Sequence, residues 1–227
     1  MDLDFYEKLI KYEFSEKFEK FGEMLVSFNK MCNITSVSDE KGIFYKHFLD
    51  SAVGESLFSE GANVVEIGSG GGFPSIPLKI VRDDLNFTLV ESTGKKCTFL
   101  NRVVDNLELK SVQVENIRAE DGARDKKMRE KFDFACARAV ARLNTLCEYC
   151  LPYVKVGGKF IAYKGACDDE VKEAANAIKI LGGEVEKILK YELPEGYGSR
   201  SLIVIKKIKN TPFAYPRGLG KERKNPL

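Results

Sequence analysis

The sequence predicts an α/β protein in which a mostly parallel, seven-stranded sheet is wrapped by helices and preceded by a helical cap. From Ala62 onward, short apolar runs alternate with longer helical patterns, which is typical of a parallel sheet covered by helices. Before Ala62 the apolar spacing is helical only. The composition, with 44% hydrophobic and 31% charged residues, is that of a folded globular chain and excludes disordered, collagenous and disulfide-scaffold proteins.

The first sixty residues are expected to form helices. Within residues 2–31, apolar side chains recur at spacings of three and four and form one helical stripe: Phe14, Phe18, Phe21, Leu25 and Phe28. A second helical stretch, from about Glu40 to Phe58, follows a polar segment with turn and cap chemistry. We therefore expect a helical cap at residues 1–60, a main domain at residues 61–207 and a basic tail at residues 208–227.

The main domain is expected to alternate strands and helices. The parallel strands are predicted at Asn63–Ile67, Asn86–Glu91, Ser111–Glu115, Phe132–Ala137 and Lys159–Lys164. The helices are predicted at Pro74–Val81, Gly94–Leu107, Leu143–Cys150 and Asp168–Leu181. Two further strands, Glu184–Tyr191 and Arg200–Lys206, lie close enough in sequence to form an antiparallel pair at the sheet edge.

The charge is unevenly distributed along the chain. The formal net charge is +2, but the residues from Lys206 onward carry +6 and the rest of the chain carries −4. A basic tail on a mildly acidic body indicates a polyanionic partner, and a solvated terminus is the alternative. The charge alone leaves both interpretations open.

The cysteines and the N-terminus indicate a cytoplasmic protein without a metal site. Only Cys147 and Cys150 of the six cysteines are closely spaced, and the chain has one histidine, so we expect these thiols to be buried on one helix face rather than bound to a metal. The N-terminus is acidic where a signal peptide would be basic, and no run of eighteen apolar residues exists. We expect no membrane association.

A glycine-rich turn directly follows the first predicted strand and precedes a helix, at Glu66–Pro74. Such a turn lets the backbone approach a nucleotide closely. A dinucleotide site requires G-x-G-x-x-G, but position 73, where the third glycine would stand, is Phe73. The arrangement of Gly68, Gly70 and Gly72 instead resembles motif I of class I S-adenosylmethionine-dependent methyltransferases, which have a Rossmann-like fold.

Further candidate residues stand at the carboxyl ends of the other strands, where open α/β sheets bind ligands. Glu91 is placed to hold the ribose hydroxyls, with capping of the helix at Thr93 as the alternative. Ala119 and Glu120 could hold the adenine edge. Arg138, where the methyl acceptor would lie, could pair with a carboxylate, a phosphate or the methionine end of the cofactor, with a surface arginine as the alternative.

Two motifs that other methyltransferases use are missing. No Asp/Asn-Pro-Pro-Tyr/Phe follows the fourth strand, as is typical of enzymes that methylate exocyclic amino groups, and no Pro-Cys supplies the thiolate that cytosine C5 chemistry needs. An acceptor that is already nucleophilic fits better, and guanine N7 needs orientation rather than a base.

Several sequence blocks, together covering nearly the whole chain, resemble the RsmG (glucose-inhibited division protein B) family of 16S ribosomal RNA guanine-N7 methyltransferases. They are Asn33-Ile34-Thr35-Ser36-Val37, Lys46-His47-Phe48-Leu49-Asp50-Ser51, the turn from Gly68 to Leu78, Glu91-Ser92-Thr93-Gly94-Lys95-Lys96, Ala137-Arg138-Ala139-Val140-Ala141, Ala162-Tyr163-Lys164-Gly165, and the tail from Tyr215 to Leu227. The sequence departs from the family pattern at Glu66, where the family usually has Asp, and at Ser75, where it usually has Gly.

The resemblance implies a set of site residues. S-adenosylmethionine would contact Gly68, Phe73, Ala119, Glu120 and Arg138, with Glu91 at the ribose and Gly70 and Gly72 in the same turn. His47 and Asp50 would lie at the mouth of the active site and Lys164 near the RNA, so that Arg138, Lys164, His47 and Asp50 form the catalytic group.

The resemblance also implies a substrate, the 16S ribosomal RNA of the small subunit, for an enzyme that we expect to act as a monomer. Two alternatives stay open from the residues alone. One is a methyltransferase of the same fold that acts on a small molecule or a protein. The other is an RNA-binding module that has lost catalysis.

Overall fold

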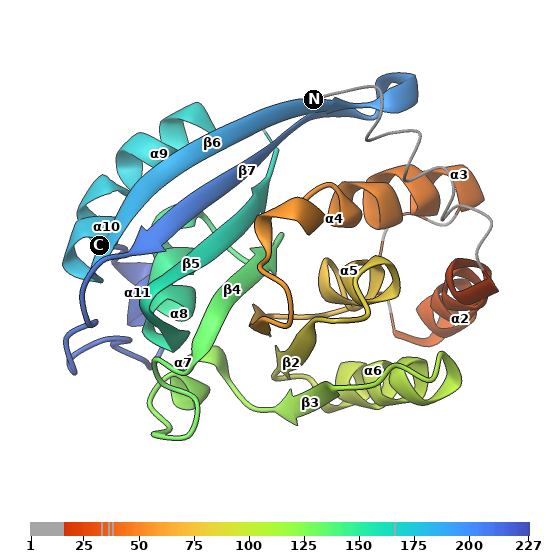
Figure 1. Cartoon of the computed structure of the whole chain (residues 1–227), viewed down its shortest axis with the longest axis horizontal. Coiled ribbons are helices and arrows are strands. Elements are labelled where there is room, and N and C mark those ends of the chain that lie inside the picture. Colours follow the sequence, from red (N-terminus) through yellow and green to blue (C-terminus); the bar gives the residue numbers. More distant parts are fainter. Residues whose placement is uncertain (1–15, 33, 36, 38, 166) are drawn as a thin grey trace.

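The computed structural model describes residues 16–227 except 33, 36, 38 and 166, and it shows one seven-stranded sheet between two layers of helices (Figure 1). The strands are β1 (Asn63–Ile67), β2 (Asn86–Glu91), β3 (Val112–Asn116), β4 (Phe132–Arg138), β5 (Val154–Lys164), β6 (Gly183–Leu193) and β7 (Gly198–Lys207). Their order is β3-β2-β1-β4-β5-β7-β6. The first five strands are parallel, and β7 runs antiparallel to both β5 and β6, so the predicted fold class is confirmed.

Most helices lie close to their predicted positions, but the short helices α7 and α11 were not predicted. They are α2 (Glu16–Cys32), α3 (Glu40–Ile43), α4 (Asp50–Ala52), α5 (Ser75–Val81), α6 (Gly94–Asn106), α7 (Ala119–Gly122), α8 (Leu143–Cys150), α9 (Asp168–Glu173), α10 (Ala175–Ile180) and α11 (Lys221–Lys224), with a π-helical turn η1 (Phe44–Leu49) and the 3-10 turns η2 (Glu55–Leu57), η3 (Leu151–Tyr153) and η4 (Pro194–Gly196). The helix predicted at Asp168–Leu181 is two helices, and the second cap helix includes the π-helical turn.

Side chains alternate between the two faces of the sheet and enter two cores. On one face, Val64, Leu89 and Phe134 pack with α5, α6 and the cap, and on the other face Val65 and Ala135 pack with α8 and α10. This division follows from the period of two in a strand. The central strands are buried on both sides, as a parallel sheet requires.

The cap shares the first of these cores. Phe21 of α2 lies 5.3 Å from the ring of Phe48 and 5.4 Å from the ring of Phe73, measured between ring centres. Phe14, which the predicted stripe also includes, lies outside the described residues. The aromatic stripe therefore fixes the cap against the glycine turn.

The tail packs against the main domain and is not a solvated terminus. Thr211, Pro216, Gly218 and Glu222 are buried, and β7 ends at Lys207, whose fully buried ammonium donates to the Leu151 carbonyl and to the hydroxyl of Thr211. Lys207, one of the basic residues from Lys206 onward, is thus occupied by internal contacts.

Cys147 and Cys150 are buried on α8 as expected. In the described part of the chain, no His, Cys, Asp or Glu side chains group in a way that could hold a metal ion, and no helix there is long and apolar enough to cross a membrane.

Candidate active site

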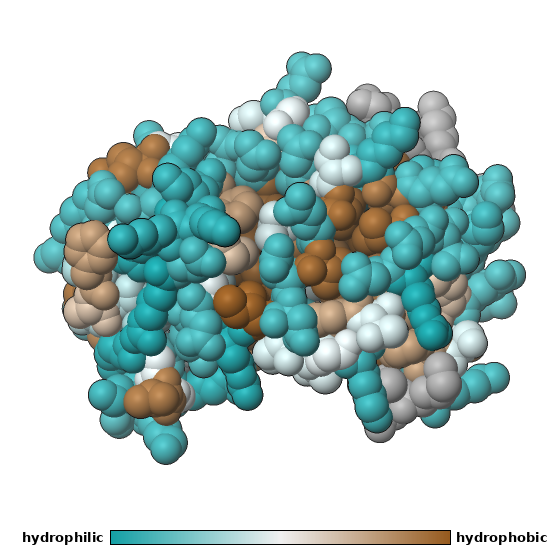
Figure 2. All heavy atoms as spheres, turned by 90° about the horizontal axis from the view of Figure 1, so that it is seen from below, coloured by the Kyte–Doolittle hydropathy of each residue, from teal (hydrophilic) through white to brown (hydrophobic). Residues whose placement is uncertain are grey.

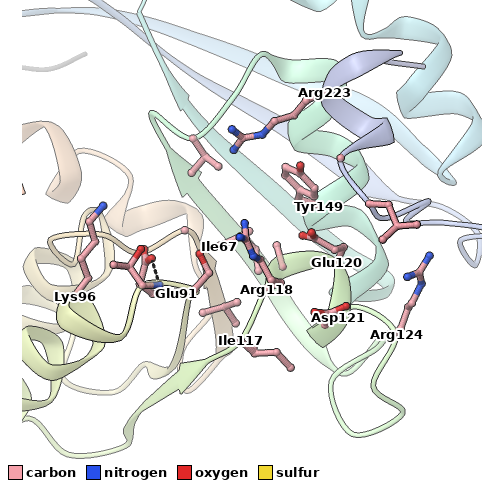
Figure 3. Close-up of a pocket in the computed structure, with 18 of the residues that line it drawn as sticks. Ile67, Glu91, Lys96, Ile117, Arg118, Glu120, Asp121, Arg124, Tyr149 and Arg223 are labelled. Atoms are coloured by element: carbon pink, nitrogen blue, oxygen red, sulfur yellow. Dashed lines mark hydrogen bonds between the residues drawn. The ribbon is translucent and has the colours of Figure 1, made fainter.

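A cleft of about 720 Å³ opens at the carboxyl ends of β1, β2, β3 and β4. Its walls are the turn after β1, the end of β2 with the turn that follows, the segment from Ile117 to Asp121, the turn after β4, and Tyr149 of α8. Three residues of the tail, Leu219, Gly220 and Arg223, complete it (Figure 3). The face of the molecule in Figure 2 is mostly hydrophilic, and its exposed hydrophobic residues gather mainly near the centre of the view.

The glycine turn is held against β2 by its backbone. The N–H groups of Gly68 and Ser69 both donate to the Val90 carbonyl, at 2.8 and 3.2 Å. Gly68 has φ +71°, and a Cβ there would lie 2.7 Å from the Val140 side chain. Gly70 has φ +55°, and a Cβ there would meet no atom closer than 3.8 Å. Gly68 is therefore required for the close approach of two chain segments, whereas Gly70 borders open space.

Glu91, at the end of β2, is a buried carboxylate that lines the cleft. Its Oε2 accepts the N–H of Gly70 at 3.0 Å and its Oε1 accepts the N–H of Thr93 at 2.7 Å. Both roles considered for this residue are therefore compatible, because it supports the helix start and also faces the cleft. A carboxylate has about four acceptor sites, so each oxygen keeps one for a ligand hydroxyl.

Ala119 and Glu120, in the first turn of α7, both line the cleft on the side of β3. The Tyr153 hydroxyl donates to the Ala119 carbonyl at 2.7 Å and fixes this turn. Figure 3 shows Glu120 and Arg118 on the opposite side of the cleft from Lys96 and Glu91. The predicted ribose and adenine residues thus face one space.

Arg138, at the end of β4, points toward the cap. Its guanidinium donates to the Lys46 carbonyl at 2.6 Å and to Asp50 Oδ2 at 2.9 Å, and it lies 2.7 Å from His47 Nδ1. Its side chain is 14% exposed and lies over the ring of Phe73 at 5.0 Å. The surface-arginine alternative is wrong, because the guanidinium ties the cap to the sheet. Arg138 is not among the described residues that line the cleft, so its cofactor contact stays a prediction.

His47 is held in one neutral tautomer. Because Arg138 can only donate, Nδ1 of His47 accepts, and its Nε2 then donates to the Thr35 hydroxyl at 2.6 Å. Burial and the charge of Arg138 lower the pKa of His47 to about 3. The imidazole stacks on the Phe73 ring at 4.6 Å between ring centres. His47 therefore stays neutral and joins the cap to Arg138 and Phe73.

Asp50 joins Arg138 to strands β6 and β7 at the edge of the sheet. Its Oδ1 accepts the Tyr191 hydroxyl at 2.7 Å, and Arg200 Nε lies 3.6 Å from the same oxygen. Burial and the charge of Asp50 raise the pKa of Tyr191, which keeps its hydroxyl protonated as a donor. The predicted group of His47, Asp50 and Arg138 is thus one contiguous network.

Two other predicted residues have internal partners. The Lys164 side chain is 10% exposed, and its ammonium donates to the Ala141 carbonyl at 2.7 Å. The same ammonium lies 2.7 Å from the Glu170 carboxylate, so Lys164 connects the turn after β4 to α9. The buried Phe73 side chain packs on the aromatic rings of the cap. Contacts of Lys164 with RNA and of Phe73 with a cofactor stay predictions, as does a cofactor role for Gly72, whose φ of +87° the turn needs.

Glu66 lies beneath the turn in the core rather than in the cleft. It is fully buried, and neither carboxylate oxygen has a hydrogen-bond partner among the described residues. Burial raises the pKa of Glu66 to about 8, against the opposing effects of nearby Ser75 and Arg138. This carboxyl is therefore mostly protonated at neutral pH.

Sequence reasoning missed the tail residues of the cleft. Leu219, Gly220 and Arg223 follow the other lining residues by at least 70 positions in the sequence. The only signal in this region was the basic charge of the tail, which favoured a polyanionic partner. Tyr149, which lies inside the helix predicted at Leu143–Cys150, also lines the cleft.

Comparisons with known proteins agree on the family and the fold. The family model GidB, described as rRNA small subunit methyltransferase G, matches residues 14–202. Ribosomal RNA small subunit methyltransferase G of Desulforamulus reducens is 46% identical over 213 residues, which cover 92% of this chain and 89% of that protein. The protein of the same name from Clostridium beijerinckii is 43% identical over 215 residues, which cover 93% of this chain and 90% of that protein. A solved SAM-dependent methyltransferase from Aquifex aeolicus is 17% identical with a TM-score of 0.56, covering 76% of this chain and 96% of its own, which shows the class I fold.

Proposed function

This chain belongs to the rRNA small subunit methyltransferase G family, and we propose that it transfers the methyl group of S-adenosylmethionine to guanine N7 in the 16S ribosomal RNA of the small subunit. The observation that carries the cofactor assignment is the hydrogen bond from the Gly70 N–H to Glu91, which joins the glycine turn to a carboxylate that lines the cleft. The proposed enzyme acts in the cytoplasm, where this substrate is made, as a monomer without a metal.

The residues of the cleft fit this cofactor. Glu91 would accept the two ribose hydroxyls, because its carboxylate is already oriented by backbone N–H groups and keeps an acceptor site on each oxygen. The open space beside Gly70 leaves a path for the methionine part, which a side chain at this position would fill. Ala119 and Glu120 would hold the adenine edge, and Gly68 brings the backbone close.

The chemistry requires little from side chains. S-adenosylmethionine supplies a methyl group on a positively charged sulfur, and guanine N7 offers a free lone pair. Orientation and exclusion of water then provide most of the catalysis. His47, with its pKa of about 3, stays neutral and is not needed as a base. We propose that Arg138, His47 and Asp50 act as positioning residues that fix the cap over the site, and that Lys164 fixes the turn after β4.

The test is methyl transfer from labelled S-adenosylmethionine to small subunits from cells that lack this protein, followed by nucleoside mass spectrometry. Naked 16S RNA is assayed in parallel, and the Gly70→Asp variant is the control without a cofactor path. We expect 7-methylguanosine as the single product. Cofactor binding without labelling of rRNA would refute the RNA assignment and favour a small molecule or a protein as acceptor.

A further inference from the structure

The tail closes one side of the cleft. Leu219, Gly220 and Arg223 line it together with Tyr149, Glu120 and Arg124. Figure 3 shows Arg223 entering from the short helix α11, above Tyr149 and across the cleft from Glu91 and Lys96. These tail residues therefore lie on the side of α7 and α8, next to the proposed adenine position, and across the cleft from the end of β2 and the start of α6.

The tail is held in this place by buried contacts. Arg217 binds the fully buried Glu148 of α8 through its backbone N–H at 2.7 Å and through its guanidinium at 2.8 to 3.2 Å. Arg124 donates to the carbonyls of Pro216 and Arg217 at 2.6 and 2.8 Å. Buried Glu222 accepts the N–H of Gly218 and its carbonyl accepts the Thr145 hydroxyl at 2.9 Å. A segment with this many internal partners is a fixed wall.

The part of the tail between these anchors has an unusual conformation. Gly218, Leu219 and Gly220 all have positive φ, at 73°, 59° and 75°. Leucine rarely adopts this region, and here its side chain is 90% exposed at the cleft. A large apolar side chain that is exposed to water at the edge of a cleft stabilises the protein only when a ligand or another chain buries it.

We propose that residues 217–223 form the outer wall of the cofactor site, and that Leu219 and Arg223 contact the adenosine part of the bound cofactor. This inference rests on the proposed use of S-adenosylmethionine. Leu219 would pack on the flat face of adenine, and the planar guanidinium of Arg223 would stack on the purine or bond to its nitrogen atoms. Direct contact with RNA phosphates is the competing role for Arg223.

Isothermal titration of the full chain with S-adenosylmethionine and with S-adenosylhomocysteine tests the proposal. Arg223→Ala and Leu219→Ala are each expected to weaken both ligands roughly fivefold or more, because both ligands contain the same adenosine. Lys224→Ala is the matched control for charge, since Lys224 is exposed on the same helix and is not a lining residue. Phe213→Ala is the control for an exposed apolar tail residue, being 94% exposed outside the cleft. Both controls should bind like the unaltered chain.

The outcomes separate the possible errors. Unchanged affinities in Arg223→Ala and Leu219→Ala would overturn the proposal, and reduced binding of rRNA in Arg223→Ala with an unchanged cofactor affinity would assign Arg223 to RNA instead. A loss for only one of the two ligands would place the contact at the sulfur end and overturn the adenosine assignment. If the unaltered chain bound neither ligand, the proposed function itself would fail.

Discussion

Replacing Arg217 with alanine should cost more folding stability than replacing its partner Glu148 with glutamine. The Glu148 side chain is 0% exposed, whereas that of Arg217 is 23% exposed and can turn to water. Arg217→Ala leaves the buried carboxylate without a counter-charge and with only the backbone N–H of residue 217 as a partner from the tail, which costs about 3–5 kcal/mol. Glu148→Gln removes the charge but keeps an acceptor, so the loss is that of a charge-assisted hydrogen bond, about 1.5–3 kcal/mol.

Urea unfolding and thermal melting at pH 7 measure this difference. For a chain of this size, the loss in Arg217→Ala corresponds to a fall in melting temperature of roughly 6–20 °C. Lys224→Ala, which removes the same charge from an exposed position, should stay within about 0.5 kcal/mol of the unaltered chain. If Arg217→Ala proved no more destabilising than Glu148→Gln, the buried carboxylate would not be the source of the cost and the reasoning would be refuted.

Gly70→Asp should abolish cofactor binding in titration while the protein stays folded with a modest fall in melting temperature, because a φ of +55° strains any side chain but no atom lies closer than 3.8 Å to its Cβ; intact binding would contradict the open path. Arg138→Ala should lower both methyl transfer and the melting temperature, since it loses bonds to Lys46 and Asp50; full stability with lost turnover would argue against its tie to the cap. Glu66 has a folded pKa of about 8 against 4.5 in the unfolded chain, so the folded state binds the extra proton and stability falls as pH rises from 4.5 to 8. Glu66→Gln should flatten that slope in melting curves from pH 5 to 9, and parallel curves for the two proteins would exclude a raised pKa.

The sequence was sufficient to predict most of the fold. The bounds of β1, β2 and α8 agree with the predicted ranges, and the antiparallel pair stands at the sheet edge as expected. The predicted helix at Asp168–Leu181 divides at Ala174, whose backbone the local apolar pattern does not specify. Strands and helices can be predicted from the sequence because each has a hydrophobic period set by residues only a few positions apart.

The sequence by itself determined the glycine turn and the carboxylate at the end of β2, since a positive φ and a strand end are local properties. Only the tertiary structure decided the partners of the charged side chains. Arg138 bonds to Asp50 across 88 positions, and Arg217 bonds to Glu148 across 69. The sequence of a basic tail is the same whether its arginines bind a polyanion or a buried carboxylate, because charge is a property of the single residue. The partner of each charge depends on which distant segments the packed core brings within hydrogen-bond distance.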